Sequence, residues 1–159
     1  MRRTFGVIGM LVAAALAFAP TASGESWGPA TPNFNVEATL LPVQGGPGDA
    51  FGLVKFRQPK DADALAYLNI WVRDLAPGRY LVQRAVDPVV NDVCAGTNWT
   101  MPTLGAVTTD LSGTGRVQLT RSLAAIRLGT ELDIHFRVID AATSAVVLQS
   151  GCYQFVVSQ

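Results

Sequence analysis

Residues 65–87 read LAYLNIWVRDLAPGRYLVQRAVD, and the alternation in this stretch decides the fold class. Leu68, Ile70 and Val72 fall on one face of an extended chain, because successive side chains of a strand point to opposite sides. The other face then carries Tyr67, Asn69, Trp71 and Arg73. The Ala-Pro-Gly run at 76–78 is typical of a tight turn, and strand character resumes after it. This stretch therefore predicts two strands and no helix.

The same strand-and-turn pattern continues in both directions along the chain. Further runs of strand character lie at 34–43, 49–59, 107–110, 115–120, 131–140 and 146–157. Gly- and Pro-rich clusters separate most of them, and residues 121–129 have room for only a short helical turn. Several short strands with no extended helix predict an all-β fold. We expect about eight antiparallel strands in a Greek-key β-sandwich or flattened barrel.

The first 24 residues have the pattern of a secretory signal peptide. Arg2 and Arg3 form a basic start, residues 7–19 form an apolar run too short for a permanent membrane span, and 22–24 are small residues suited to cleavage. A membrane anchor is the alternative. Both the general secretory and the twin-arginine export routes stay open, because the two arginines precede Thr and Phe.

Removal of this leader would leave 135 of the 159 residues, the size of one domain. We expect 25–33 to be a lead-in and 34–159 to be a single β-sandwich domain. The leader carries two arginines and no acid, so ten basic and twelve acidic side chains would remain, a net charge of −2. That balance is not the footprint of nucleic-acid binding, and no later apolar run is long enough to span a membrane. We expect a secreted protein, extracellular or periplasmic.

Two cysteines, Cys94 and Cys152, lie in the part of the chain expected to be exported. An even number of cysteines in an oxidising compartment favours a disulfide, and only one pairing exists. A catalytic cysteine is the alternative, but neither cysteine has a basic residue suited to activate it nearby in the sequence. We therefore expect a structural Cys94–Cys152 bond.

His135, the only histidine, lies in the stretch ELDIHFRVID at 131–140. The apolar residues of this stretch alternate with the others and should enter the core. His135 should then face outward among Glu131, Asp133 and Arg137. Two interpretations follow: a solvated surface residue, which we favour, or a residue of a chemical site.

The sequence contains no recognisable catalytic signature. It has no Gly-x-Ser-x-Gly elbow, no phosphate loop and no dinucleotide fingerprint. Copper or zinc needs several nitrogen, sulfur or carboxylate donors in one place, and one histidine does not supply them. A pair of carboxylates could be drawn from Asp61, Asp63, Asp87 and Asp92, but these lie in turn-like segments where Asp serves the backbone. We expect no enzyme activity and no cofactor.

The outward set Tyr67, Asn69, Trp71 and Arg73 is the best candidate for a binding surface. Aromatic side chains beside arginine are the residue types that anchor protein interfaces. The alternative is that the irregular segment 88–105, which contains Trp99, covers Trp71. The partner expected for an exposed face is an unidentified protein or glycan.

Several motifs together resemble the secreted copper/zinc superoxide dismutase family, whose fold is an eight-stranded Greek-key barrel. The resemblance spans about 38–157 and rests on the segments GLVKF (52–56), VRDLAPGRYLVQRAVD (72–87), CAGTNW (94–99), TTDLSGTG (108–115), TELDIHFRVID (130–140) and SGCYQFVV (150–157). It implies the same barrel and a disulfide between a loop and the last strand, which matches Cys94–Cys152.

Most functional residues of that family have no counterpart here. The resemblance places copper histidines at Leu81 and Gln83, the bridging histidine at Asn98, a zinc histidine at Val107 and an active-site arginine at Gln149. Only Asp110 and His135 keep a ligand residue type, as relics of a metal site. The expected function is therefore a secreted, non-catalytic, superoxide-dismutase-like module for binding or for the cell envelope. The alternative is a vestigial protein that binds copper or zinc weakly through His135.

Overall fold

A computed structural model describes residues 35–59, 64–94 and 101–158. The expected leader, the lead-in, Asp61, Asp63, Asn98 and Trp99 lie outside these ranges. Within them the chain forms nine strands: β1 (Asn35–Pro42), β2 (Phe51–Arg57), β3 (Leu65–Arg73), β4 (Gly78–Asp87), β5 (Thr103–Thr109), β6 (Gly115–Ser122), β7 (Glu131–Asp140), β8 (Val146–Ser150) and β9 (Tyr153–Val156). The described ranges hold no helix, and so none long and apolar enough to cross a membrane.

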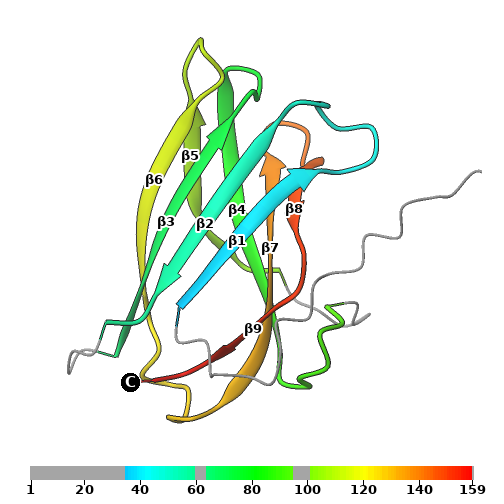
Figure 1. Ribbon diagram of the computed structural model, residues 1–159. Coiled ribbons are helices and arrows are strands. Elements are labelled where there is room, and N and C mark those ends of the chain that lie inside the picture. Colours follow the sequence, from blue (N-terminus) through cyan, green and yellow to red (C-terminus); the bar gives the residue numbers. More distant parts are fainter. Residues whose placement is uncertain (1–34, 60–63, 95–100, 159) are drawn as a thin grey trace, which may run out of the picture.

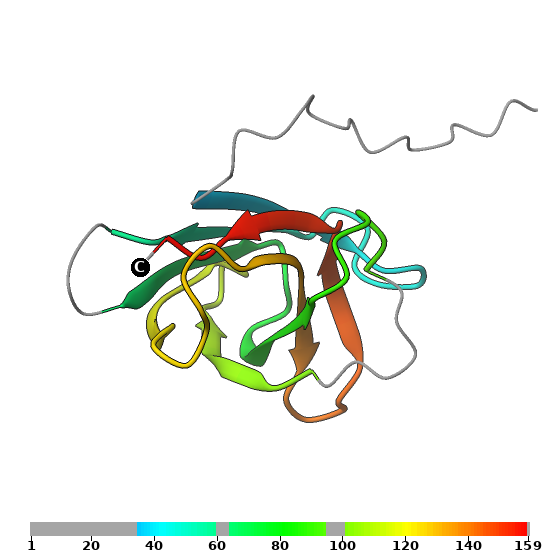
Figure 2. The same cartoon turned by 90° about the horizontal axis from the view of Figure 1, so that it is seen from below.

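Eight of these strands close into an antiparallel barrel (Figure 1). Their order is β4-β5-β6-β3-β2-β1-β8-β7, and pairing of β7 with β4 closes the ring. The view along the barrel shows the strands surrounding one interior (Figure 2). β4, β5 and β6 follow one another, and β7 returns beside β4, which is a Greek key. The all-β fold expected from the sequence is confirmed.

Alternation of side chains builds the core as the sequence indicated. Leu68, Ile70 and Val72 of β3 are buried, whereas their neighbours on the strand face outward. The same pattern holds in β2 and β7, whose buried Val54, Phe56, Ile134, Phe136 and Val138 complete much of the interior. These three strands thus each contribute an apolar face to the inside of the barrel, and burial of apolar faces is the main stabilising term.

The turn at 76–78 joins two strands that do not pair with each other. β3 pairs with β2 and β6, whereas β4 pairs with β5 and β7. The hydroxyls of Tyr80 and Thr109 donate to the carbonyl of Ala76, at 2.9 and 2.7 Å. These bonds hold the chain where it crosses from one side of the barrel to the other.

Two strand boundaries differ from those expected. β5 begins at Thr103, inside the segment that the sequence indicated as irregular, and its pairing with β4 skips Leu104 in a bulge. The expected strand 146–157 is divided: β8 pairs with 137–139 of β7, and β9 pairs with 131–134. On the edge away from β4, β7 therefore pairs with β9 along its first half and with β8 along its second half.

The disulfide lies at this division. Cys94 and Cys152 are bonded, with Cα atoms 5.2 Å apart, as expected from the sequence. The segment leading to Cys94 folds onto β7, because the carboxylate of Asp133 accepts hydrogen bonds from the backbone N–H groups of Asn91 (3.0 Å) and Asp92 (2.9 Å). Asp133 is fully buried as a result.

Candidate binding face

The four residues singled out in the sequence do share the outer surface of one sheet. Tyr67 is 38% exposed, Arg73 is exposed, and Asn69 and Trp71 are half-buried. β3 lies between β2 and β6, so outward side chains of three strands meet here. We name as the candidate binding face the residues Phe51, Leu53, Lys55, Tyr67, Asn69, Trp71, Arg73 and Arg116.

An aromatic cluster with a stacked arginine lies at one end of this face. The rings of Phe51 and Trp71 meet edge to face, with centroids 6.1 Å apart and planes at 63°. The guanidinium of Arg73 lies over both rings, 5.4 Å from the Phe51 centroid and 5.9 Å from the Trp71 centroid. Such cation–π contacts hold a long side chain in place, so this cluster is organised in advance.

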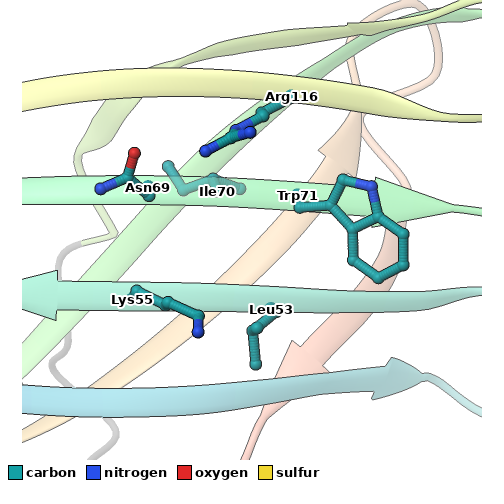
Figure 3. A pocket seen from close by; sticks show the side chains of 6 residues that line it. All are labelled: Leu53, Lys55, Asn69, Ile70, Trp71 and Arg116. Carbon is teal, nitrogen blue, oxygen red and sulfur yellow. The ribbon is translucent and has the colours of Figure 1, made fainter.

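A hollow of about 210 Å³ lies next to the cluster (Figure 3). Its lining comes from β2 (Leu53, Lys55), β3 (Asn69, Ile70, Trp71) and β6 (Arg116). In the sheet register, Lys55 pairs with Asn69, and Arg116 pairs with Trp71. Asn69 Oδ1 accepts a hydrogen bond of 2.8 Å from Gln118 Nε2, which fixes the amide beside the hollow. The hollow thus has an apolar floor and a cation on each side.

The charge of this surface is positive, although the full chain has no net charge. Outward cations on the three strands are Lys55, Arg57, Arg73 and Arg116. Two acids lie against them: Glu37, 3.2 Å from Lys55, and Asp74, 3.5 Å from Arg73. Exposed pairs of this kind contribute about 0–1 kcal/mol, so an incoming anion would displace the acids at little cost.

The described part of the segment 88–105 does not cover Trp71. Residues 88–94 lie over β7, where Asp133 binds them, and 101–102 lead into β5. Trp99, which the alternative interpretation placed beside Trp71, lies outside the described residues. Trp71 keeps part of its surface exposed in the structure.

His135 faces outward from β7, as its strand pattern indicated, but its ring is half-buried instead of fully solvated. Nδ1 lies 3.4 Å from the carbonyl oxygen of Gly151 and 3.5 Å from Ser150 Oγ. Burial lowers the pKa of His135, and the positive charge of Arg137 lowers it further, against the opposing effect of the backbone contacts. These contacts place the ring against Ser150, the last residue of β8, and Gly151, which follows it.

Asp110 and His135, the two expected relics of a metal site, are far apart. Along β4, Gly78 pairs with Thr109 and Ala85 pairs with His135, a separation of seven residues or about 23 Å. Asp110 instead closes the turn between β5 and β6, where its Oδ1 accepts hydrogen bonds from Ser112 and Thr114. These bonds lower the pKa of Asp110.

Other described positions at which the resemblance implies a metal ligand or the active-site arginine fall on two different sides of the barrel wall. Gln83 and Gln149 lie outward beside Arg137, which donates from Nε to Gln83 Oε1 at 2.7 Å. Val107 is fully buried in the interior and shares no surface with them. No group of three or more His, Cys, Asp or Glu side chains suited to a metal occurs among the described residues.

Sequence reasoning missed the contributions of β2 and β6 to the candidate binding face. Phe51, Leu53 and Lys55 are outward residues of a recognisable strand, but only the pairing of β2 with β3 brings them beside Trp71. Arg116 comes from a strand 40 residues or more further along the chain.

No protein-family model matches the chain, and a search of curated proteins finds no match either.

Proposed function

We propose that the protein is a secreted, non-catalytic binding module whose partner is a protein with an acidic surface. The observation that carries this proposal is the arrangement of Phe51, Trp71 and Arg73 beside a hollow flanked by Lys55 and Arg116. Tryptophan, tyrosine and arginine contribute most of the binding energy in protein interfaces, and this face carries all three.

The charge of the face favours an acidic partner. Lys55 and Arg116 flank the hollow, and their exposed positions would steer an oppositely charged surface toward it. The apolar floor at Leu53 and Trp71 offers a contact for an aliphatic or aromatic side chain. Binding should weaken as ionic strength rises, because exposed charges are screened within about 8 Å at physiological salt.

The absence of catalysis and the place of action belong to the same proposal. The leader-like pattern of residues 1–24 supports export, and the Cys94–Cys152 bond is compatible with an oxidising compartment. A Greek-key barrel with a disulfide from a loop to the start of the final strand supports a relationship to the superoxide dismutase-like family.

A photo-crosslinking experiment tests the proposed face. A photoreactive amino acid replaces Tyr67 on the face, and in a control protein it replaces the exposed Thr108 on β5. Irradiation of producing cells should trap an acidic protein from position 67 and not from position 108. Mass spectrometry of the crosslinked product identifies that protein.

Calorimetry with the purified partner then measures the contribution of each side chain. Trp71→Ala should weaken binding about thirtyfold or more, as expected for an interface anchor. Arg116→Glu should also weaken binding, with the larger loss at low salt. Arg79 is an exposed arginine on β4, outside the face, and Arg79→Glu should have little effect. The proposal would be contradicted if Trp71→Ala bound the partner with unchanged affinity. It would also be contradicted if no protein were crosslinked and the protein were instead retained on an acidic polysaccharide.

A further inference from the structure

Two arginines point into the lower end of the barrel, on the inward faces of β4 and β6. Arg84 follows the buried Val82 on the inward side of β4. Arg121 pairs in register with Ala66, which is fully buried, and lies on the inward side of β6. Both side chains are half-buried. Charged residues at inward positions of a barrel are costly unless something neutralises them.

A small cavity of about 40 Å³ lies between these arginines and the core. Its apolar lining includes Phe56, Leu68, Leu104, Leu123, Ile126 and Phe155. Figure 2 views the barrel from this end, where the segment between β6 and β7 lies near the opening. That segment is a turn held by the bond from Ile126 N–H to the carbonyl of Leu123, at 2.8 Å.

The wall of the barrel is loose beside the cavity. β5 and β6 share only one register pair, Thr109 with Gly115, at the far end of both strands. Nearer the cavity the side chain of Leu119 packs against Gly105, where an added Cβ would lie 2.7 Å from Leu119 Cδ2. Few backbone bonds therefore hold β5 to β6 at this end of the barrel.

Neither guanidinium has an acidic partner among the described residues. The two ion pairs found there, Lys55–Glu37 and Arg73–Asp74, lie elsewhere. Arg121 Nη1 donates to its neighbour's carbonyl, on Thr120, at 2.6 Å, and Arg84 makes no side-chain hydrogen bond in the described ranges. Burial lowers the pKa of Arg84, and the charge of Arg121 lowers it further. Two like charges thus face one cavity, and no acid of the described ranges pairs with either of them.

We propose that this cavity binds the carboxylate of a small apolar acid, held between Arg84 and Arg121. Two guanidinium groups supply the forked donors that a carboxylate accepts best. The adjoining apolar side chains favour a ligand with hydrocarbon next to its charged end. An apolar residue at position 84 would close the barrel without the cost of a half-buried charge, so the arginine is better explained by a ligand than by packing.

The size of the cavity limits the ligand. A volume of about 40 Å³ is slightly more than one water molecule occupies in the liquid, so it holds a carboxylate and little else. The hydrocarbon would then extend outward past Ile126, a half-buried residue of the lining, along an apolar mouth. Short straight-chain acids should therefore bind better as they lengthen, until the chain passes the end of this apolar mouth.

Calorimetric titration at fixed pH and ionic strength tests the proposal, with acetate, butyrate and hexanoate as probes. Affinity should rise by up to about fourfold for each methylene that becomes buried. Hexanamide, which has the same chain and no charge, should not bind. Arg84→Gln and Arg121→Gln should each weaken hexanoate binding about tenfold to hundredfold, the usual loss for a charge-assisted hydrogen bond. Arg79→Gln, an exposed arginine on the same strand as Arg84, is the matched control.

Thermal unfolding of each variant without ligand shows whether it folds. Arg84→Gln should be at least as stable as the natural protein, because it removes a repulsive pair. No binding of hexanoate at millimolar concentration, equal binding of hexanamide, or unchanged affinity in folded Arg84→Gln would each overturn the proposal. Phosphate binding as tightly as hexanoate would overturn it too, since the apolar contacts would then have no part. The site shares no residue with the candidate binding face, so either proposal stands or fails alone.

Discussion

Asp133 joins the segment after β4 to the outer surface of β7 through its carboxylate. Its Oδ2 accepts two backbone N–H groups, while Oδ1 is buried with no hydrogen-bond partner among the described residues. A fully buried carboxylate is tolerated only where its bonds offset much of the cost of removing it from water. Asp133 thus favours local order in the segment that reaches Cys94.

Asp133→Ala is expected to release that segment. Asn91 and Asp92 are exposed, so loss of the acceptor costs the net worth of the bonds to the carboxylate, about 1–3 kcal/mol each. Hydrogen exchange should show both amides exchanging about five- to a hundredfold faster. Asp87→Ala is the control, because its carboxylate accepts only the exposed N–H of Val89 in the described ranges. Equal exchange rates in the two variants would contradict this account.

His135 should make stability depend on pH in a defined window. Its pKa is lowered in the folded protein from 6.5, chiefly by burial and then by Arg137, so the unfolded chain binds the proton more readily. The stabilising contribution is therefore complete above pH 6.5 and is lost as the pH falls through the folded pKa.

Urea unfolding at intervals between pH 7.5 and 5 measures this effect. The natural protein should lose stability toward the lower pH, and His135→Gln should lose less. The pKa values of Asp110 and Asp140 are lowered below 3.8, so these carboxylates titrate outside the window. A profile as steep in His135→Gln as in the natural protein would show that other groups carry the dependence.

At the scale of the elements, the turn between β5 and β6 combines a positive φ with a close backbone contact. Gly113 has φ of +77°, and a Cβ there would lie 2.6 Å from the carbonyl oxygen of Leu75. Gly129 has nearly the same φ, +79°, with nothing within 4 Å of the added atom. Substitution of Gly129 therefore measures the cost of the backbone conformation alone, whereas substitution of Gly113 adds the cost of a steric clash.

Gly129→Ala should therefore lower the free energy of unfolding by about 1–2 kcal/mol, the cost of a left-handed residue with a side chain. Gly113→Ala should lower it by about 1–3 kcal/mol more, because the Leu75 backbone must also move. Chemical denaturation of both variants measures the difference. Equal losses would mean that the turn shifts freely.

The sequence predicts elements well where alternation is regular and poorly where tertiary contacts interrupt it. The faces of β2, β3 and β7 follow directly from their residue patterns. The start of β5 does not, because Gly105 looks like a turn residue but is a strand residue that makes room for Leu119. The division of β8 from β9 is also hidden, since only their shared pairing with β7 reveals it.

The candidate binding face could be predicted only in part, because alternation reveals the residues of one strand and not those of its neighbours. Tyr67, Asn69, Trp71 and Arg73 lie on one strand and follow from its period. Phe51 and Arg116 join them through sheet pairing, which local patterns do not encode. The inward direction of Arg84 follows from alternation, but its companion Arg121 is known only from the closed barrel.

At the scale of the whole molecule, the barrel keeps apart Asp110 and His135, the two residues that the resemblance marks as relics of a metal site. Calorimetric titration with Cu²⁺ or Zn²⁺ is expected to show no stoichiometric binding at micromolar concentration, because one imidazole gives little affinity. Elemental analysis of protein purified without chelators provides an independent measurement. Tight one-to-one binding that disappears in His135→Ala would reverse this expectation and would favour the vestigial metal protein.

The Cys94–Cys152 bond has a mechanical consequence for the whole chain. The two cysteines are separated by 58 positions in the sequence, and the segment between them contains β5, β6, β7 and β8. When the chain is pulled from its two ends, the force passes through the disulfide and not through the segment between the cysteines. That segment therefore does not extend, even after the barrel has unfolded. A reducing agent would release about 200 Å of further extension in a single-molecule pulling experiment.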